Sequence, residues 1–431
     1  MVNNDGLRIP HRRIVMPSFH EHQLSNGLRV VAEIDRRGYS AAFGYFVRSG
    51  SRDETDRQSG LSHFLEHMMF KGTSKRSAAD VNRELDELGG SSNAYTSEEQ
   101  TVYYATVLPK FQRRIVELLS DMLQPSLDAD EFETERQVIL EEIAKYQDQP
   151  PFGAFERSME CFFGPRGLGR RVLGTPESIS AMTADDLRAY FQSRYRPGNI
   201  VLAATGNVDF DALVQQAETM TAAWSDRGNT ANPPADDPDI LPPGIALDTS
   251  LESPDLQQTY VVRLGGGPSM VDDDRYPAAI LGTILGDEGG SRLFWDLIDT
   301  GRAEVATVWQ QEFMDAGAWF TYLVCAAEDR EANLRWIDQA LERVVQDGVT
   351  DDELEQVTRK AIASAIMQSE RPSNRLFGLG GRYLVTGEYR SLDDFIDRIR
   401  AVTKEQVNDA AKKYLTQDHV EITVQSEPVP S

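Results

Sequence analysis

Two periods of apolar and polar positions run through the first 150 residues, and each predicts a different kind of element. Short runs rich in β-branched and aromatic residues predict strands, at about 28–34, 40–47 and 103–107. Apolar residues at helical spacing predict amphipathic helices, at about 78–88, 111–123 and 129–146, besides one within 60–72. Strands and helices therefore share one region of sequence, which is typical of an α+β domain.

The end of the chain repeats a pattern from its first half. Segments 175–208 and 391–426 share an acidic turn, an amphipathic helix, a tyrosine and a β-rich strand, at an offset of about 219–220 residues. Such a repeat predicts two homologous α+β domains, each an α/β sandwich. The proline-rich segment 226–252 is the expected linker, which gives an N-terminal domain at 1–225 and a C-terminal domain at 253–431.

Composition narrows the classes of function. The chain has 431 residues, 69 acidic and 44 basic, and its net charge of −25 argues against a nucleic-acid partner. Two distant cysteines, Cys161 and Cys325, are too few for a disulfide framework or a cysteine-based zinc site. We find neither an apolar run long enough to span a membrane nor the apolar core of a secretory signal, so we expect a cytoplasmic protein with no membrane partner.

The helix predicted within GLSHFLEHMMFKGT, residues 60–73, carries most of the candidate chemistry. Its apolar residues recur at helical spacing, Ser59 or Ser62 is the expected N-cap, and Gly72 is the expected end. The same segment contains two of the six histidines of the chain, four positions apart. A chain this poor in histidine is not expected to place two of them together without a specific use.

Residues four apart on a helix lie on the same face, so His63 and His67 can present two imidazole nitrogens to one metal ion. Glu66 directly precedes His67 and can approach a metal-bound water without being a ligand. Zinc lowers the pKa of such a water to about 7, so a nearby carboxylate can accept its proton. The simpler interpretation is a pair of buried core histidines, which does not account for the glutamate.

A catalytic zinc site needs a third protein ligand on another element. The predicted helix 129–146 carries Glu135 and Glu142, two turns apart at the edge of its apolar face, whereas Glu141 points further away from that face. A carboxylate beside an apolar surface is costly unless it is paired or bound to a metal. This favours Glu142 as the third ligand, and the alternative is that these glutamates are ordinary surface charges.

These motifs together resemble the inverzincin zinc peptidases, in which His-x-x-Glu-His is followed by a distant glutamate. The nearest resemblance is to the pitrilysin and mitochondrial processing peptidase family. It covers the segments GLSHFLEHMMFKGT, GGSSNAYTSEEQTVYYATV and ERQVILEEI, and in the second half GDEGGSRLFWDLI. The resemblance implies two α+β halves that close like a clamshell on a chamber, which would admit short or unfolded peptides.

The resemblance also implies roles for individual residues. His63, His67 and Glu142 would bind one zinc ion per chain, and Glu66 would be the general base. Glu135 would support the metal site from beside it.

In the same family, the tetrapeptide NAYT would be an edge strand of the first sheet. Asn93 and Ala94 would hold the peptide substrate there through main-chain hydrogen bonds. The alternative is that residues 93–96 are only a turn that enters a strand. Acidic composition and the family analogy together suggest basic residues near the cleavage point.

The second half departs from the family pattern at two positions. Active members carry an arginine and, seven residues later, a tyrosine that touch the substrate near the scissile bond. Ile298 and Val305 occupy those positions here. The missing donors would have to come from Arg302 or Tyr322 of this chain or from a sister subunit, unless the zinc-binding half acts with altered specificity.

The sequence therefore predicts a zinc-dependent endopeptidase for short or unfolded peptides, acting as a homodimer or as a heterodimer. The alternative is a non-catalytic or partner-dependent subunit of a heterodimeric processing peptidase. The complete His-x-x-Glu-His motif favours the first, and the missing arginine and tyrosine favour the second. A zinc hydrolase acting on another class of substrate is the third possibility, against which the edge strand argues.

Overall fold

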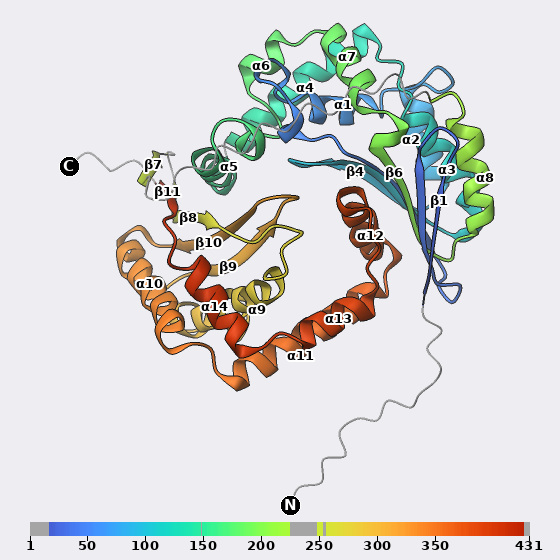
Figure 1. Ribbon diagram of the computed structural model, residues 1–431. Coiled ribbons are helices and arrows are strands. Elements are labelled where there is room, and N and C mark those ends of the chain that lie inside the picture. Colours follow the sequence, from blue (N-terminus) through green and yellow to red (C-terminus); the bar gives the residue numbers. More distant parts are fainter. Residues whose placement is uncertain (1–16, 148, 225–247, 253–255, 426–431) are drawn as a thin grey trace, which may run out of the picture.

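A computed structural model of the protein describes residues 17–147, 149–224, 248–252 and 256–425. It contains two β-sheets, one in each half of the chain, with helices on both faces of each (Figure 1). The strands of the first sheet are β1 (Ser18–Gln23), β2 (Arg29–Ile34), β3 (Ala41–Val47), β4 (Ser91–Thr96), β5 (Thr101–Val107) and β6 (Ile200–Gly206). Those of the second sheet are β7 (Asp248–Glu252), β8 (Thr259–Gly266), β9 (Val305–Glu312), β10 (Gly317–Cys325) and β11 (Val420–Gln425).

The helices follow the same division between the two halves. Those of the first half are α1 (Leu61–Met68), α2 (Ala78–Glu87), α3 (Gln112–Met122), α4 (Ala129–Gln147), α5 (Pro150–Phe163), α6 (Pro176–Ala181), α7 (Ala184–Arg194) and α8 (Phe210–Thr221). Those of the second half are α9 (Arg275–Gly286), the π-helical turn η6 (Phe294–Ile298), α10 (Arg330–Asp347), α11 (Asp351–Ser369), α12 (Pro372–Thr386), α13 (Leu392–Arg400) and α14 (Lys404–Tyr414). No helix within the described ranges is both long and apolar enough to span a membrane.

The two sheets share one topology. The first has the strand order β1-β2-β6-β3-β5-β4, and the second has the order β7-β11-β8-β10-β9. Strand β6 runs parallel to β2 and antiparallel to β3, and β11 runs parallel to β7 and antiparallel to β8 in the same way. The predicted repeat is confirmed, since α6, α7 and β6 correspond to α13, α14 and β11.

Helix α5 belongs to the first half by sequence but packs on the second sheet. Its side chains Ala154, Phe162 and Phe163 share one hydrophobic core with Phe320 of β10 and Ile422 of β11. Figure 1 shows α5 beside that sheet and away from the strands of its own half. The second sheet is therefore covered on one face by a helix from the other half.

Helix α12 makes the reciprocal contact with the first sheet. Leu376 is fully buried in a core that it shares with Phe46 of β3. A Cβ added at Gly380 would come within 2.2 Å of the Phe46 ring, so the helix approaches the sheet at a distance that only glycine permits. Arg375 of α12 also forms an ion pair with Glu33, which is 5% exposed on β2. Each half therefore depends on the other for cover, in the arrangement seen in Figure 1.

The proline-rich segment 226–252, expected to be a linker, lies outside the described residues as far as residue 247. Its last five residues instead form β7, which pairs in parallel with β11 at the edge of the second sheet. This pairing uses main-chain hydrogen bonds, which a composition-based prediction of a linker does not register. The proposed boundaries of the two domains stay a prediction.

Candidate metal centre

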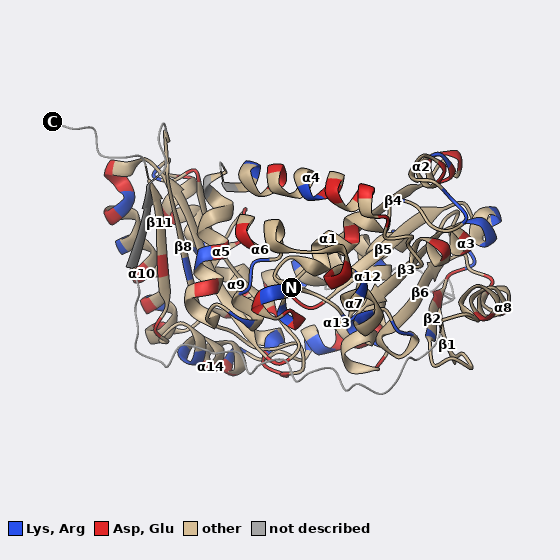
Figure 2. Ribbon diagram, turned by 90° about the horizontal axis from the view of Figure 1, so that it is seen from above, with Lys and Arg blue, Asp and Glu red and all other residues tan. Residues whose placement is uncertain are grey.

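Helix α1 is anchored in the core of the first half by its apolar face. Leu61, Phe64, Leu65 and Met68 are buried, and the Phe64 ring stacks on Phe132 of α4 at 4.6 Å between centroids. This contact brings α1 and α4 together, so polar residues at the edges of their apolar faces meet. Figure 2 shows α4 with acidic positions along its length.

The N-terminus of α1 differs from the sequence prediction. Neither Ser59 nor Ser62 is the N-cap, which is Gly60 with φ +93°, and the helix ends at Met68, short of Gly72. A Cβ at Gly60 would lie 2.7 Å from Ile179, which excludes a cap with a side chain. The N-cap differs from the prediction because the cap is tertiary rather than local.

The buried carboxylate of Glu54 takes the place of the cap. It accepts hydrogen bonds from the amide groups of Gly60 and Ser62, at 2.8 and 2.7 Å. These are two of the amides that lack partners within a helix. Burial raises the pKa of Glu54 to about 8, although these hydrogen bonds act in the opposite direction. No local pattern would have predicted this residue, since it precedes the helix by seven positions.

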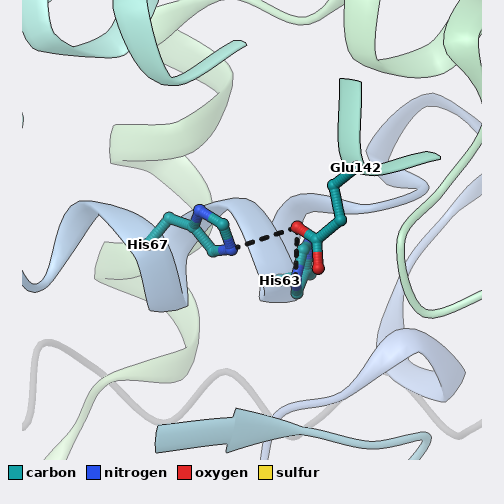
Figure 3. A group of neighbouring side chains, drawn as sticks. All are labelled: His63, His67 and Glu142. Atoms are coloured by element: carbon teal, nitrogen blue, oxygen red, sulfur yellow. Dashed lines mark ion pairs between the residues drawn. The ribbon is translucent and has the colours of Figure 1, made fainter. Parts of the chain in front are cut away.

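The structure brings together His63, His67 and Glu142, as the sequence predicted. Glu142 Oε2 of α4 lies 3.7 Å from His63 Nε2 and 3.5 Å from His67 Nε2 (Figure 3). One ligand atom from each of the three residues lies within 4.8 Å of the other two, so the group could hold a metal ion. Glu141, the neighbouring glutamate, is exposed and does not belong to this group.

The separations match what a tetrahedral zinc ion requires. Zinc binds histidine nitrogen and carboxylate oxygen at about 2.0–2.2 Å, which places two ligand atoms of a tetrahedron roughly 3.4 Å apart. The two distances from Glu142 lie within 0.3 Å of that value. Two neutral imidazoles and one carboxylate also form the donor set of known catalytic zinc sites with an open fourth position. The residues therefore fit the ion.

A second carboxylate fixes the orientation of His67. Glu135 is 3% exposed, and its Oε1 lies 2.8 Å from His67 Nδ1. If Nδ1 carries the proton of that bond, the lone pair of Nε2 faces Glu142. Lys71 forms an ion pair with the other oxygen of Glu135. The hydrogen bonds to His67 and Lys71 outweigh burial and hold the pKa of Glu135 below its usual range.

The two histidines differ in protonation. Burial, and then the charge of His67, lower the pKa of His63 to about 3, so that its imidazole is neutral over the physiological range. Burial lowers the pKa of His67 as well, but the hydrogen bond with Glu135 and the charges of nearby carboxylates outweigh it and raise this pKa. Protons therefore compete with a metal ion for His67 more than for His63.

Glu66 lies one turn from His63 and contacts the last residue of β4. Its Oε2 accepts a hydrogen bond of 2.6 Å from the hydroxyl group of Thr96. Burial raises the pKa of Glu66, which this hydrogen bond partly counteracts. Thr96 was not among the site residues predicted from the sequence, although strand periodicity could have indicated it. Ala94 is buried against the core, and a residue two positions along the strand lies on the same face.

The predicted edge strand is confirmed as β4, which among the described strands pairs with β5 alone. Asn93 is exposed on this edge and Ala94 is 8% exposed. The side-chain oxygen of Asn93 accepts a hydrogen bond from the amide of Ala94, at 2.9 Å. Neither residue belongs to the metal group, and both lie on the strand that positions Thr96.

The second-half positions that depart from the family pattern contribute apolar contacts. Ile298 ends η6 and packs on the core of that half, and Val305 begins β9 opposite Val324. The Arg302 guanidinium covers the Trp336 ring of α10 at 4.9 Å, and the Tyr322 ring contacts Phe155 of α5 at 5.2 Å. All these contacts lie within the second half and α5.

Comparison with known proteins identifies the family of this chain. Residues 29–176 match the model of the insulinase family, peptidase family M16, and residues 181–360 match that of the peptidase M16 inactive domain. A Streptomyces coelicolor protein named as an uncharacterized zinc protease is 34% identical over 401 residues, covering 91% of this chain and 86% of the relative. A Bacillus subtilis protein named in the same way is 30% identical over 396 residues, covering 91% of this chain and 95% of the relative.

Solved structures show the same fold. The crystal structure of a protease from Helicobacter pylori has a TM-score of 0.87 at 22% identity, covering 95% of this chain and 100% of that chain. The resemblance predicted from the sequence motifs is thus confirmed over both halves of the molecule. This chain belongs to peptidase family M16, the insulinase family of metallopeptidases.

Proposed function

We propose that this chain is a zinc-dependent endopeptidase for short or unfolded peptides, with His63, His67 and Glu142 as the ligands of one zinc ion. One observation carries the proposal: two imidazole nitrogens and a carboxylate oxygen lie at the spacing of zinc ligands. When bound, zinc supplies Lewis acidity that polarises a carbonyl group and acidifies a water molecule. Glu135 keeps His67 in the tautomer that binds.

Glu66 is the proposed general base. Its carboxylate takes a proton from the attacking water as the water oxygen bonds to the carbonyl carbon, and it delivers that proton to the amine nitrogen when the C–N bond breaks. The Thr96 hydroxyl group holds one oxygen of Glu66, which leaves the other for the water. The raised pKa of Glu66 suits this role, because a more basic carboxylate accepts a proton more readily near neutral pH.

The edge of β4 is the proposed binding site for the substrate main chain. A peptide that adds to this edge as a further strand must be extended, which excludes folded proteins. The main chain of such a peptide competes with the Asn93 side chain for the amide of Ala94. Thr96 is the last residue of the same strand, so β4 would both bind the peptide and position Glu66.

The test is cleavage of a pool of unstructured peptides by the purified chain, read by mass spectrometry. We expect products from the zinc-loaded chain and none from Glu66→Gln, which keeps its zinc. General bases contribute about 100- to 10,000-fold to a rate, so the loss is easily measured. Cleavage at full rate by Glu66→Gln would exclude this residue as the base. Exposed Glu133, on the same helix as Glu142, offers Glu133→Gln as a control.

A second candidate function is that of a partner-dependent subunit. Ile298 and Val305, in place of the family's arginine and tyrosine, favour it, since an oxyanion left without a donor costs about 100- to 1,000-fold in rate. A zinc-loaded chain that cleaves nothing alone but cleaves when mixed with a sister subunit would establish this function. Activity of a homodimer alone would exclude it.

A further inference from the structure

A cavity of about 630 Å³ lies between the two halves of the molecule. None of the proposed zinc ligands lines it, so it is distinct from the metal centre. It begins where β4 ends, because Tyr95 and residues 97–100 form part of its wall. Helices α9, α11, α12 and α13 and the turn between β9 and β10 contribute most of the rest. A peptide bound along β4 would pass directly into this space.

The wall of this cavity is basic, although the chain as a whole is acidic. Five arginines and three glutamates line it, with no lysine and no aspartate. Two of the arginines, Arg275 and Arg390, contact one tyrosine, Tyr276, and Arg382 interacts electrostatically with both arginines. The Tyr276 hydroxyl accepts hydrogen bonds from Arg275, at 2.6 Å, and from Arg390. The Tyr276 ring lies under both guanidinium groups, at 4.6 and 5.8 Å.

Two of these guanidinium charges lack a close carboxylate. Arg275 is neutralised by Glu312 at 2.9 Å. Arg382 has only Glu388, at 3.8 Å, and its Nε and Nη1 atoms are buried without a hydrogen-bond partner among the described residues. Arg390 donates to a hydroxyl group and forms no ion pair in the described part of the chain. The Arg382 side chain is 14% exposed, and buried guanidinium donors without a partner are unfavourable for stability, which calls for another explanation.

The pKa shifts of Arg382 and Arg390 are consistent with uncompensated positive charge in the cluster. Burial, followed by the charges of Arg390 and Arg275, lowers the pKa of Arg382. Burial also lowers the pKa of Arg390, with further contributions from Arg275 and Arg398. The positive charge of the cluster therefore exceeds what its own neighbours compensate. A guanidinium group with free donors binds a carboxylate through two parallel hydrogen bonds, which is the partner that this geometry best suits.

We propose that this cavity binds a carboxylate side chain of the peptide held at β4, so that the enzyme selects peptides with an aspartate or glutamate beyond the scissile bond. The selection rests on the proposed peptidase function, whereas the anion site itself does not. Arg382 and Arg390 are the binding residues, and Tyr276 positions Arg390. An acidic substrate residue is the opposite of the basic one expected from composition. The whole chain has a net charge of −25, whereas the cavity wall has more arginines than glutamates.

The experiment measures binding with the zinc-loaded Glu66→Gln chain, which is expected to bind peptides without cleaving them. The probes are labelled unstructured peptides that carry one glutamate at successive positions, each matched by the same peptide with glutamine. We expect one position at which glutamate binds about 10-fold more tightly, as one charge-assisted pair provides. Added Arg382→Gln or Arg390→Gln should abolish that preference. Arg335→Gln, at a residue 66% exposed on α10, should leave it unchanged.

A thermal-unfolding measurement separates binding from structure. Arg382→Gln removes an unpaired charge, so we expect its Tm to equal or exceed that of the parent, whereas a residue retained for stability would lower it. Equal binding of every glutamate and glutamine pair overturns the proposal, as does a preference that survives both substitutions or an absence of binding. Should the preference hold while the chain with Glu66 cleaves nothing, the peptidase proposal fails and the anion site stands.

Discussion

The helix pair α1 and α4 has a counterpart in α9 and α11, which occupy the same places in the element order of the second half. Helices α4 and α11 both have 19 residues. Their seventh and fourteenth residues are Glu135 and Glu142 in α4, but Val357 and Ser364 in α11. Helix α9, with the sequence RYPAAILGTILG, contains no histidine, cysteine, aspartate or glutamate.

The two halves show which residues are needed for the fold and which are needed only for the proposed metal site. Both halves build a sheet of the same topology and bury a continuous core. Val357, 8% exposed in the second half, belongs to that core, whereas Glu135 at the matching position is 3% exposed and needs His67 and Lys71 as partners. The residues of the proposed metal site are therefore not required by the fold, and at the position of Glu135 they introduce a buried carboxylate where the second half has a valine.

The largest expected effect of a single change tests this difference directly. Glu142→Gln should remove bound zinc and lower peptidase activity by more than about 1,000-fold, because only two ligands are left. Ser364→Ala, at the matching position of α11, should change neither zinc content nor activity. Metal analysis after dialysis and a peptide-cleavage assay measure both. Glu141→Gln is the neighbouring control, and equal zinc loss from it would mean that another glutamate is the ligand.

The stability of the protein as a function of pH should distinguish the acidic residues at the N-termini of α1 and α9. Burial raises the pKa of Glu54 above its unfolded value, so its contribution to stability is complete below about pH 4.5 and lost as the pH rises through about 8. The free energy of unfolding should fall by roughly 4 kcal/mol over that interval. Asp274 occupies the N-cap position of α9 without a side-chain capping hydrogen bond, and Lys413 and Tyr414 hold its pKa down against the effect of burial. Its contribution is present above about pH 4 and lost on acidification.

Urea denaturation of the chain in EDTA at several pH values would measure this dependence without metal binding. Glu54→Gln should remove the decline between pH 4.5 and 8, and Asp274→Asn should weaken only the loss at acid pH. An unchanged slope in Glu54→Gln would assign the decline to another group.

Packing substitutions test whether the two halves are independent. Phe163→Ala in α5 and Leu376→Ala in α12 both remove fully buried side chains from the sheet of the opposite half. Each should lower the free energy of unfolding by about 3 kcal/mol, within one cooperative transition. Calorimetry measures both quantities. Phe152→Ala, at a residue 49% exposed on α5, should cost much less. Two separate transitions would show that the halves unfold independently.

The smallest effect concerns the support of the metal site. Glu135→Gln should lower zinc affinity by about 10- to 100-fold, since His67 keeps its ring position but loses a charged partner. Competition with a zinc chelator measures the affinity. Glu133→Gln, 61% exposed on the same helix, is the control that should retain full affinity. An affinity unchanged by Glu135→Gln would limit this residue to a structural role.

Much of the first half could be predicted from local sequence. Helices and strands with clear periodicity were found within a few residues, including α2, α3 and α4. The spacing of His63 and His67, together with the periodicity of α4, predicted the group that the structure brings together. The edge position of β4 was also correctly predicted, through the resemblance to the family.

Features built from distant segments could not be predicted in this way. Glu54 caps α1 across a turn, and Thr96 reaches Glu66 from a strand thirty residues away. The exchange of α5 and α12 joins residues that lie far apart in the sequence, such as Arg375 and Glu33, which are 342 positions apart. Periodicity reports which side of an element is apolar, but it does not report which other element covers that side.

The exchange of α5 and α12 has a consequence for synthesis on the ribosome. The last strand of the first sheet, β6, ends at Gly206, and α12 begins at Pro372. At roughly 5–20 residues per second, about 10–30 s pass before the covering helix emerges. For that time one face of a nascent sheet, with Phe46 among its side chains, has no permanent cover. A fragment that ends after the first half should therefore aggregate or require a chaperone, even though it contains every proposed zinc ligand.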